Sequence, residues 1–197
     1  MKARDTIVAI VQHGLAPALK HEGFRKQQLN FARRRGSVAH FVQVQLSSWN
    51  QGPSGAFYVN IGVMFDEMRK HFVRDVPDLP KYDDCDFMVR LEKLIPDAPM
   101  QWLVDADTDV ATVSGELVDC VLQGVVQPLE SVDSLAEFQR VGWLHAVPWG
   151  FPAHFHYLAG DLEEASQLVK AEADYFADRG VTYDGLVQSY RFAKLER

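Results

Sequence analysis

The sequence contains little cysteine, which bears on its compartment and on metal binding. Its 197 residues include two cysteines, Cys85 and Cys120, which lie too far apart to form a CxxC pair. A lone pair gives no disulfide framework of the kind that staples small secreted domains. We therefore expect a reducing, cytoplasmic compartment.

Long hydrophobic runs are absent as well. The longest purely aliphatic run covers residues 7–11 and ends at Gln12 and His13. A transmembrane helix needs about 20 consecutive apolar residues, and a signal peptide needs an apolar core of its own. We expect neither, and the hydrophobic fraction of 47% is typical of a globular protein.

Residues 37–65 contain no Lys, Arg, Asp or Glu, and the segments on either side carry opposite charge. Residues 2–36 hold eight Lys or Arg against two acids, whereas residues 66–197 hold 25 acids against 12 bases, for a net charge of −7. The basic segment either forms a patch for nucleic acid or acidic lipid or is neutralised by the acidic part across the fold. Because the whole chain is acidic, we expect neutralisation, with no nucleic-acid or membrane partner.

The common catalytic motifs are also missing. No GxSxG, GxxxxGK(S/T), GxGxxG or HExxH sequence occurs. Ser54 lies between two predicted strands and not in a strand-to-helix turn, and two aspartates precede Cys85, which disfavours a reactive thiolate. We therefore assign no catalytic residue.

One acidic stretch has the spacing of a calcium-binding loop. Asp105, Asp107, Asp109 and Glu116 match its first, third, fifth and twelfth positions. The sixth position requires glycine, and Val110 stands there. We expect Asp107 and Asp109 to interact with the positive N-terminal end of the following helix instead.

His154 and His156, with His145, form a second metal candidate. Their spacing resembles no common zinc motif, and no cysteine pair accompanies them. We expect histidines with local hydrogen bonds, and neither a metal nor another cofactor.

Hydrophobic periodicity divides the chain into a mixed first part and a helical second part. Residues 5–22 repeat apolar side chains every three or four positions, which predicts a helix that Pro17 kinks and Gly23 ends. From residue 28 to residue 65 the period is two, which predicts three strands, and segments 87–94 and 102–104 are candidates for a fourth and a fifth. A helix over about 109–126 follows, and Ser134 and Asp161 have the spacing of N-caps for later helices.

These elements predict an α+β fold: a kinked N-terminal helix, an antiparallel β-meander of three to five strands and a helical C-terminal half. We expect residues 1–197 to form a single domain. In it, residues 1–105 supply the helix and the sheet, and residues 106–197 form a helical part packed on them.

Polar side chains occupy one parity of the predicted strands. Gln43, Gln45 and Asn60 share this face, and Trp49 and Asn50 begin the loop between two of the strands. Uncharged amides both donate and accept hydrogen bonds, so the patch could bind a protein or a small polar ligand. The alternatives are a solvated or helix-covered sheet face, with Trp49 filling a gap in the core.

Three segments resemble the bacterial family known as domain of unknown function 4304. They are residues 15–26 (LAPALKHEGFRK), 42–49 (VQVQLSSW) and 57–63 (FYVNIGV). The resemblance is good over about a quarter of the chain and looser over about two thirds. A lysine of the family's second motif is replaced here by Leu46 or Ser47. The resemblance implies an α+β fold and supplies no activity or catalytic residue.

We therefore expect a non-catalytic binding or protein-interaction module, with an immunity-type antagonist of a basic toxin as one form of it. An enzyme, either a hydrolase or a transferase with an unrecognised site, is the alternative. The oligomeric state is left open.

Overall fold

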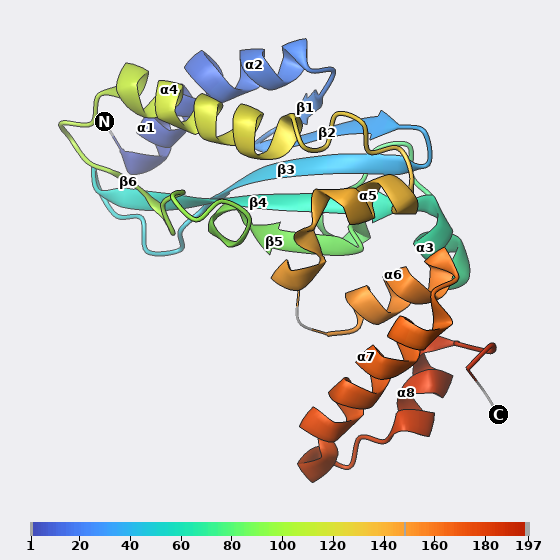
Figure 1. Cartoon of the computed structure of the whole chain (residues 1–197). Helices are drawn as coiled ribbons and strands as arrows, with labels where there is room; N and C mark the ends of the chain where they lie inside the picture. The colour runs from blue at the N-terminus through green and yellow to red at the C-terminus, as the bar shows by residue number, and fades with distance from the viewer. Residues whose placement is uncertain (1, 148, 196–197) are drawn as a thin grey trace.

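The computed structural model of the chain describes residues 2–147 and 149–195. An antiparallel six-stranded sheet forms one layer, and helices pack on one of its faces (Figure 1). The predicted α+β class is confirmed, with six strands in place of three to five.

The sheet has the strand order β1-β2-β3-β4-β5, and β6 pairs with β4 on the same side as β5. Its strands are β1 (Arg25–Gln27), β2 (Asn30–Arg35), β3 (Val38–Leu46), β4 (Gly55–Phe65), β5 (Phe87–Arg90) and β6 (Trp102–Val104). The prediction missed β1 because it placed no turn before residue 30. In the structure Gln28 turns the chain with a φ of 57°, a conformation that glutamine seldom adopts.

The two edges of this sheet are short or charged. The three residues of β1 are all exposed, and two of them are Arg25 and Lys26. On the other side, β5 pairs with residues 60–63 of β4 and β6 with residues 55–57. Neither edge therefore presents a long uncharged strand.

The N-terminal helix is continuous but irregular. It consists of α1 (Ala3–Ile10), a π-helical turn η1 (Val11–Leu15) and α2 (Ala16–His21). The kink expected at Pro17 is a π-helical turn that ends just before it, in which Ala16 N donates to Val11 O. Gly23 follows the helix with a φ of 81°, as expected for a glycine C-cap.

The first helix packs closely against α4 (Val110–Val121), which continues as the π-helical turn η4 (Leu122–Val126). Ser114 Oγ donates a hydrogen bond of 3.0 Å to Ile10 O. A Cβ atom built on Gly14 would lie 2.8 Å from Ser114 Cβ and 3.0 Å from Ser114 O. Glycine at this position is what allows the two helices to approach.

Replacing Gly14 by alanine should therefore force these helices apart. We expect Gly14→Ala to lower the free energy of unfolding by about 1–3 kcal/mol, as overpacking of a core does. Gly115→Ala is the matched control, because a Cβ atom added at Gly115 would have nothing within 4 Å, and it should raise stability by up to about 1 kcal/mol. Urea denaturation of the three proteins measures both effects, and stabilisation by Gly14→Ala would contradict the close contact.

The remaining helices lie between the strands and in the C-terminal half. They are α3 (Asp66–His71), η2 (Tyr82–Asp84), η3 (Leu91–Lys93), α5 (Leu135–Val141), η5 (Trp143–Ala146), α6 (Phe151–Ala159), α7 (Leu162–Tyr175), η6 (Ala177–Arg179) and α8 (Tyr183–Tyr190). Ser134 and Asp161 cap α5 and α7 through their side chains, as predicted. None of the described helices is both long and apolar enough to cross a membrane.

Two hydrophobic clusters hold these elements together. The larger one joins the N-terminal helix, one face of the sheet, α4 and α5, and extends to Phe155 on α6. The smaller one lies among α6, α7 and α8 and includes Tyr157, Val169 and Phe192. The last helices thus pack mainly on each other, and in Figure 1 α7 and α8 project away from the sheet.

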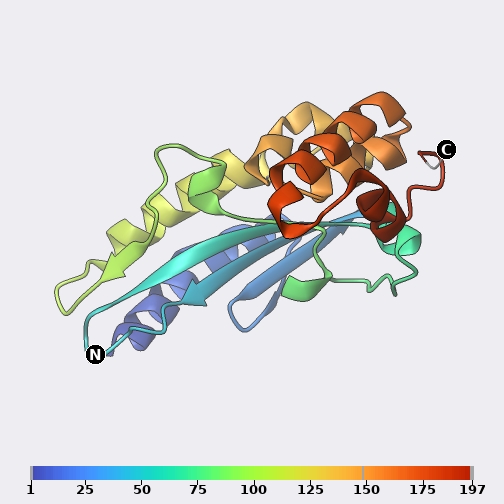
Figure 2. The ribbon, with the colours of Figure 1, turned by 90° about the horizontal axis from the view of Figure 1, so that it is seen from below.

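The face of the sheet that points away from the N-terminal helix, called the second face below, is covered over only part of its length. Near α3, residues 72–86 cross it, and Arg34 holds this segment by donating to Asp78 O at 2.9 Å and to Pro77 O at 2.6 Å. Phe41 and Met64 on this part of the face are fully buried. Figure 2 views this face from below, with the N-terminal helix behind the strands.

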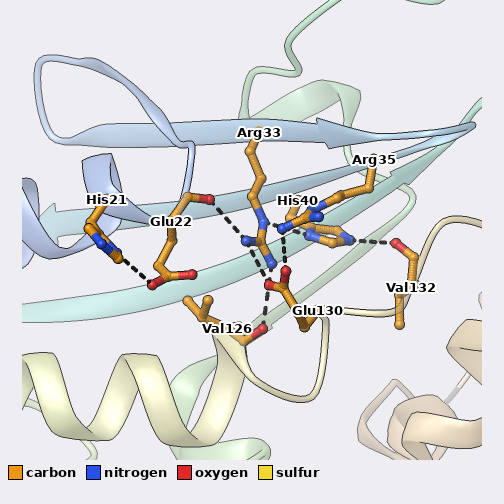
Figure 3. Close-up of polar contacts among 8 residues, drawn as sticks. All are labelled: His21, Glu22, Arg33, Arg35, His40, Val126, Glu130 and Val132. Atoms are coloured by element: carbon orange, nitrogen blue, oxygen red, sulfur yellow. Dashed lines mark hydrogen bonds and ion pairs between the residues drawn. The ribbon is translucent and has the colours of Figure 1, made fainter.

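Arg33 forms a buried polar link between the sheet and the helical layer (Figure 3). Its side chain is 2% exposed. The guanidinium donates to Glu22 O at 3.0 Å, to Glu130 Oε2 at 3.1 Å and to Val126 O at 3.5 Å. These carbonyls belong to the C-terminal ends of the first helix and of η4, where backbone oxygens lack helical partners and a cation is favoured.

His40 completes this link in a defined neutral form. Arg33 Nε donates to His40 Nδ1 at 3.1 Å, and His40 Nε2 lies 3.1 Å from Val132 O. Because a guanidinium can only donate and a carbonyl can only accept, the proton must sit on Nε2. Burial and the adjacent Arg33 charge lower the pKa of His40 to about 3.

His40 should therefore make stability depend on pH. Its folded pKa lies below the unfolded value of 6.5, so the unfolded chain binds the extra proton and stability falls as the pH drops from about 6.5 toward 3. We expect a loss of about 1.4 kcal/mol per pH unit from this group within that range. The control is His40→Gln, whose amide can keep both hydrogen bonds without titrating. The difference in free energy of unfolding between this variant and wild type should therefore change with pH. If the free energy of unfolding, measured with urea, depends on pH in the same way in wild type and in His40→Gln, the lowered pKa of His40 is refuted.

Within the described residues, four of the eight Lys and Arg side chains of the basic segment form ion pairs. Arg33 and Arg35 both pair with Glu130, Arg34 pairs with Asp66 at 2.9 Å, and the exposed Arg25 lies 3.4 Å from an Asp78 oxygen. These ion pairs neutralise part of the basic segment, and neutralisation of the whole segment stays a prediction.

Candidate functional site

The open part of the second sheet face carries a row of polar residues across four strands. Asn30 lies opposite Gln43, Gln43 opposite Asn60, and Asn60 opposite Arg90. Antiparallel pairing puts directly opposed residues on the same face, within reach of each other's side chains. The row therefore brings β2, β3, β4 and β5 into one polar surface.

Asn60 is the centre of an amide cluster, which consists of Gln43, Gln45 and Asn60. Its Nδ2 donates to Gln43 Oε1 at 2.8 Å and to Gln45 Oε1 at 2.9 Å. Asn60 is 4% exposed, whereas Gln43 is half-buried and Gln45 is exposed. The buried amide thus fixes the orientation of two glutamines that face solvent.

Arg90 adds a positive charge that the sequence analysis did not anticipate. Its guanidinium carbon lies 3.9 Å from the centre of the Tyr58 ring, within the range of a cation–π contact. Tyr58 lies on β4 opposite Gln45 of β3, and its hydroxyl donates to Gln101 Oε1 at 3.4 Å. The charge-free stretch of residues 37–65 therefore does not make up the whole of this face, because Arg90 reaches it from β5.

A groove of about 570 Å³ continues the face beyond Tyr58. Trp49, Asn50, Tyr58 and Leu103 line it, together with Ser47, Ser54, Gly55, Ala56, Gln101, Val104 and Asp105. Trp49 is 84% exposed and Leu103 is 68% exposed. Trp49 therefore does not fill a gap in the core, which was the alternative to an exposed binding residue.

Asn50 faces inward at the wall of this groove. Its Oδ1 accepts a hydrogen bond of 2.7 Å from Ala56 N, which holds the loop onto the start of β4. Its Nδ2 is buried and has no partner among the described residues. Asn50 therefore has a structural role in the loop and leaves one donor group unsatisfied beside the groove.

The five residues predicted as a patch lie along one surface. Gln43, Gln45 and Asn60 are joined by hydrogen bonds, and Trp49 and Asn50 line the groove next to Tyr58. Arg90 was missed as part of it. It lies in a segment that the sequence marks as a candidate strand, but the pairing of that strand with β4 was needed to place it beside Asn60.

The other candidates have local structural roles. Asp109 Oδ1 accepts from Ala111 N and caps α4, and Asp105 Oδ1 accepts from Asp107 N. The three histidines lie within hydrogen-bond distance of near neighbours: His145 of Gly142 O, His154 of Gly150 O, and His156 of Asp161. Within residues 2–147 and 149–195, no three His, Cys, Asp or Glu side chains are placed to hold a metal ion.

Several titratable groups line a small cavity of about 190 Å³ near α3 and the start of α6. Cys85, Asp86 and His154 line it with Arg74 and Phe72. Burial raises the pKa of Asp86 to about 6 and also raises the pKa of the Cys85 thiol. A nucleophilic cysteine needs the opposite shift, because the thiolate is the reactive form.

The fold and this surface define an α+β protein with an antiparallel sheet that is open over part of one face. A family model described as Domain of unknown function (DUF4304) matches residues 15–146, about two thirds of the chain. The chain belongs to this family, as its sequence motifs indicated. Comparisons with curated proteins and with solved structures gave no match. The family match includes the amide cluster and the groove and ends before α6.

The two loop residues should differ in their effect on stability. We expect Asn50→Ala to lower the free energy of unfolding by about 1 kcal/mol, because Ala56 N loses its acceptor. Trp49→Ala should change it by less than about 0.5 kcal/mol, since the indole lies in solvent. Urea denaturation measures both values. A larger loss for Trp49→Ala than for Asn50→Ala would contradict the exposure of the indole.

Proposed function

We propose that this protein is a non-catalytic binding protein that recognises a partner with the open face of its sheet. The binding surface consists of Gln43, Gln45, Trp49, Asn50 and Asn60, with Tyr58 and Arg90 between them. The observation that carries the proposal is the exposed Trp49 at the groove next to the amide cluster. Tryptophan, tyrosine and arginine are the residue types that contribute most to protein interfaces.

The rigidity of the surface supports the same function. Asn60 is buried and holds both glutamines, and Arg90 is stacked on Tyr58. Side chains that are already ordered lose less conformational entropy when a partner binds.

The charge of the chain supports a more specific form, an immunity-type antagonist of a basic toxin. Residues 66–197 carry 25 acids against 12 bases, and an acidic surface speeds association with a basic protein. A gene for a basic toxin beside the gene for this protein would favour this form, whereas a metabolic operon would favour the enzymatic alternative.

Affinity capture from the native host tests the binding function. Immobilised wild-type protein should retain a partner, identified by mass spectrometry, that Trp49→Ala fails to retain. Tyr175→Ala is the matched control, because Tyr175 is 65% exposed but lies on α7, outside the proposed surface. We expect this control to retain the partner. If every captured protein is retained equally by Trp49→Ala, the sheet face is not the binding surface.

A further inference from the structure

The open face presents mainly hydrogen-bond donors to a partner. Asn60 uses both Nδ2 hydrogens on the oxygens of Gln43 and Gln45, so each glutamine keeps its own NH₂ group free. At the groove, the bond from Ala56 N fixes the Asn50 oxygen inward and leaves Asn50 Nδ2 without an acceptor among the described residues. Two amide groups on this face, those of Gln43 and Gln45, therefore have N–H groups to donate to a partner, whereas Asn50 Nδ2 is buried behind the groove wall.

Arg90 provides the charge in this surface. In the part of the chain that the structure describes, it makes no ion pair with an acid, in contrast to Arg25, Arg33, Arg34 and Arg35. A guanidinium has donors and no acceptor, and it binds carboxylates through two parallel hydrogen bonds. Asp105, the one acid among the described residues that line the groove, has an oxygen that already accepts from Asp107 N and Thr108 Oγ1.

We propose that the open sheet face binds an acidic peptide segment of a partner protein. A carboxylate side chain of that segment accepts hydrogen bonds from Arg90 and from the Nε2 groups of Gln43 and Gln45. A neighbouring apolar side chain lies in the groove against Trp49 and Leu103. This inference rests on the proposed binding function and not on its toxin-antagonist form, whose argument uses the acids of residues 66–197 and not this face. It names the chemical group that the surface recognises.

The shape of the surface favours a peptide over a small molecule. Sites for small molecules enclose most of their ligand, whereas this groove is open and shares Tyr58 with the sheet face beside Gln45. In an extended peptide, side chains two residues apart lie on the same face. Such a segment can present an acid and an apolar group to the sheet together.

The first test is an NMR titration of the ¹⁵N-labelled full chain with synthetic peptides. The probe is a capped peptide in which leucine, glutamate and leucine alternate with threonine, so that these three side chains share one face. We expect it to shift the side-chain amide signals of Gln43 and Gln45 and the indole signal of Trp49. Matched peptides with glutamine or lysine in place of glutamate should bind at least about fivefold more weakly.

Arg90→Gln should weaken binding of the glutamate peptide by a similar factor, and Arg90→Lys, which keeps the charge, should weaken it less. Arg179→Gln is the matched control, because Arg179 also lies over an aromatic ring, that of Phe176 at 5.2 Å, but outside this surface. Its affinity should equal that of wild type. Equal or tighter binding of the lysine peptide, shifts confined to other residues, or no shifts up to the solubility of the peptide would overturn carboxylate recognition.

The capture experiment separates this inference from the function on which it rests. If Trp49→Ala loses the partner while Arg90→Gln retains it, the binding function stands and recognition of a carboxylate fails. If Trp49→Ala retains the partner, the binding function itself fails. Thermal unfolding of each variant checks that a loss of binding does not come from a loss of folding.

Discussion

The buried guanidinium of Arg33 is the interaction on which the arrangement of the two layers depends. It starts on the sheet and reaches backbone oxygens at the ends of two helices that are far apart in sequence, along with Glu130 in the segment before α5. A buried charge is costly unless its hydrogen bonds are made. Both helices end beside this group, so their terminal carbonyls accept its hydrogen bonds and hold the helical layer in register with the strands.

This attachment has a consequence for the opposite side of the sheet. Because the N-terminal helix and α4 are held on one face, the second face is left to residues 72–86, which cover only the apolar part near α3. The polar part has no such cover. The two glutamine oxygens accept both N–H groups of Asn60, which explains how this asparagine can be almost fully buried on a face that remains open.

Much of the fold could be predicted from sequence because its signals are local. The alternation along β3 and β4 and the N-caps at Ser134 and Asp161 depend on neighbouring residues only. The first strand was missed because Gln28 adopts a backbone conformation that its residue type does not announce. The burial of Arg33 could not be predicted from the sequence, where it is one charge in a basic segment. Its burial depends on helix ends that only the folded chain brings together.

The candidate site likewise contains residues that the sequence could place and residues that it could not. Strand parity placed Gln43, Gln45 and Asn60 on one face, and the structure joins them. Parity could not decide whether Trp49 is exposed, because loop residues have no fixed face. Arg90 required the pairing of β4 with β5, which is a contact between segments separated by a long irregular stretch.

The short and charged edges of the sheet determine how other chains can approach it. A long uncharged edge strand offers a row of free backbone groups on which a further strand can add, and such growth leads to fibrils. Here one edge ends in three exposed residues that include two cations, and the other is divided between β5 and β6. Growth of the sheet by added strands is thereby hindered. In the proposed binding function, recognition therefore falls to the side chains of the open face, which can distinguish one sequence from another, whereas a backbone edge accepts almost any extended chain.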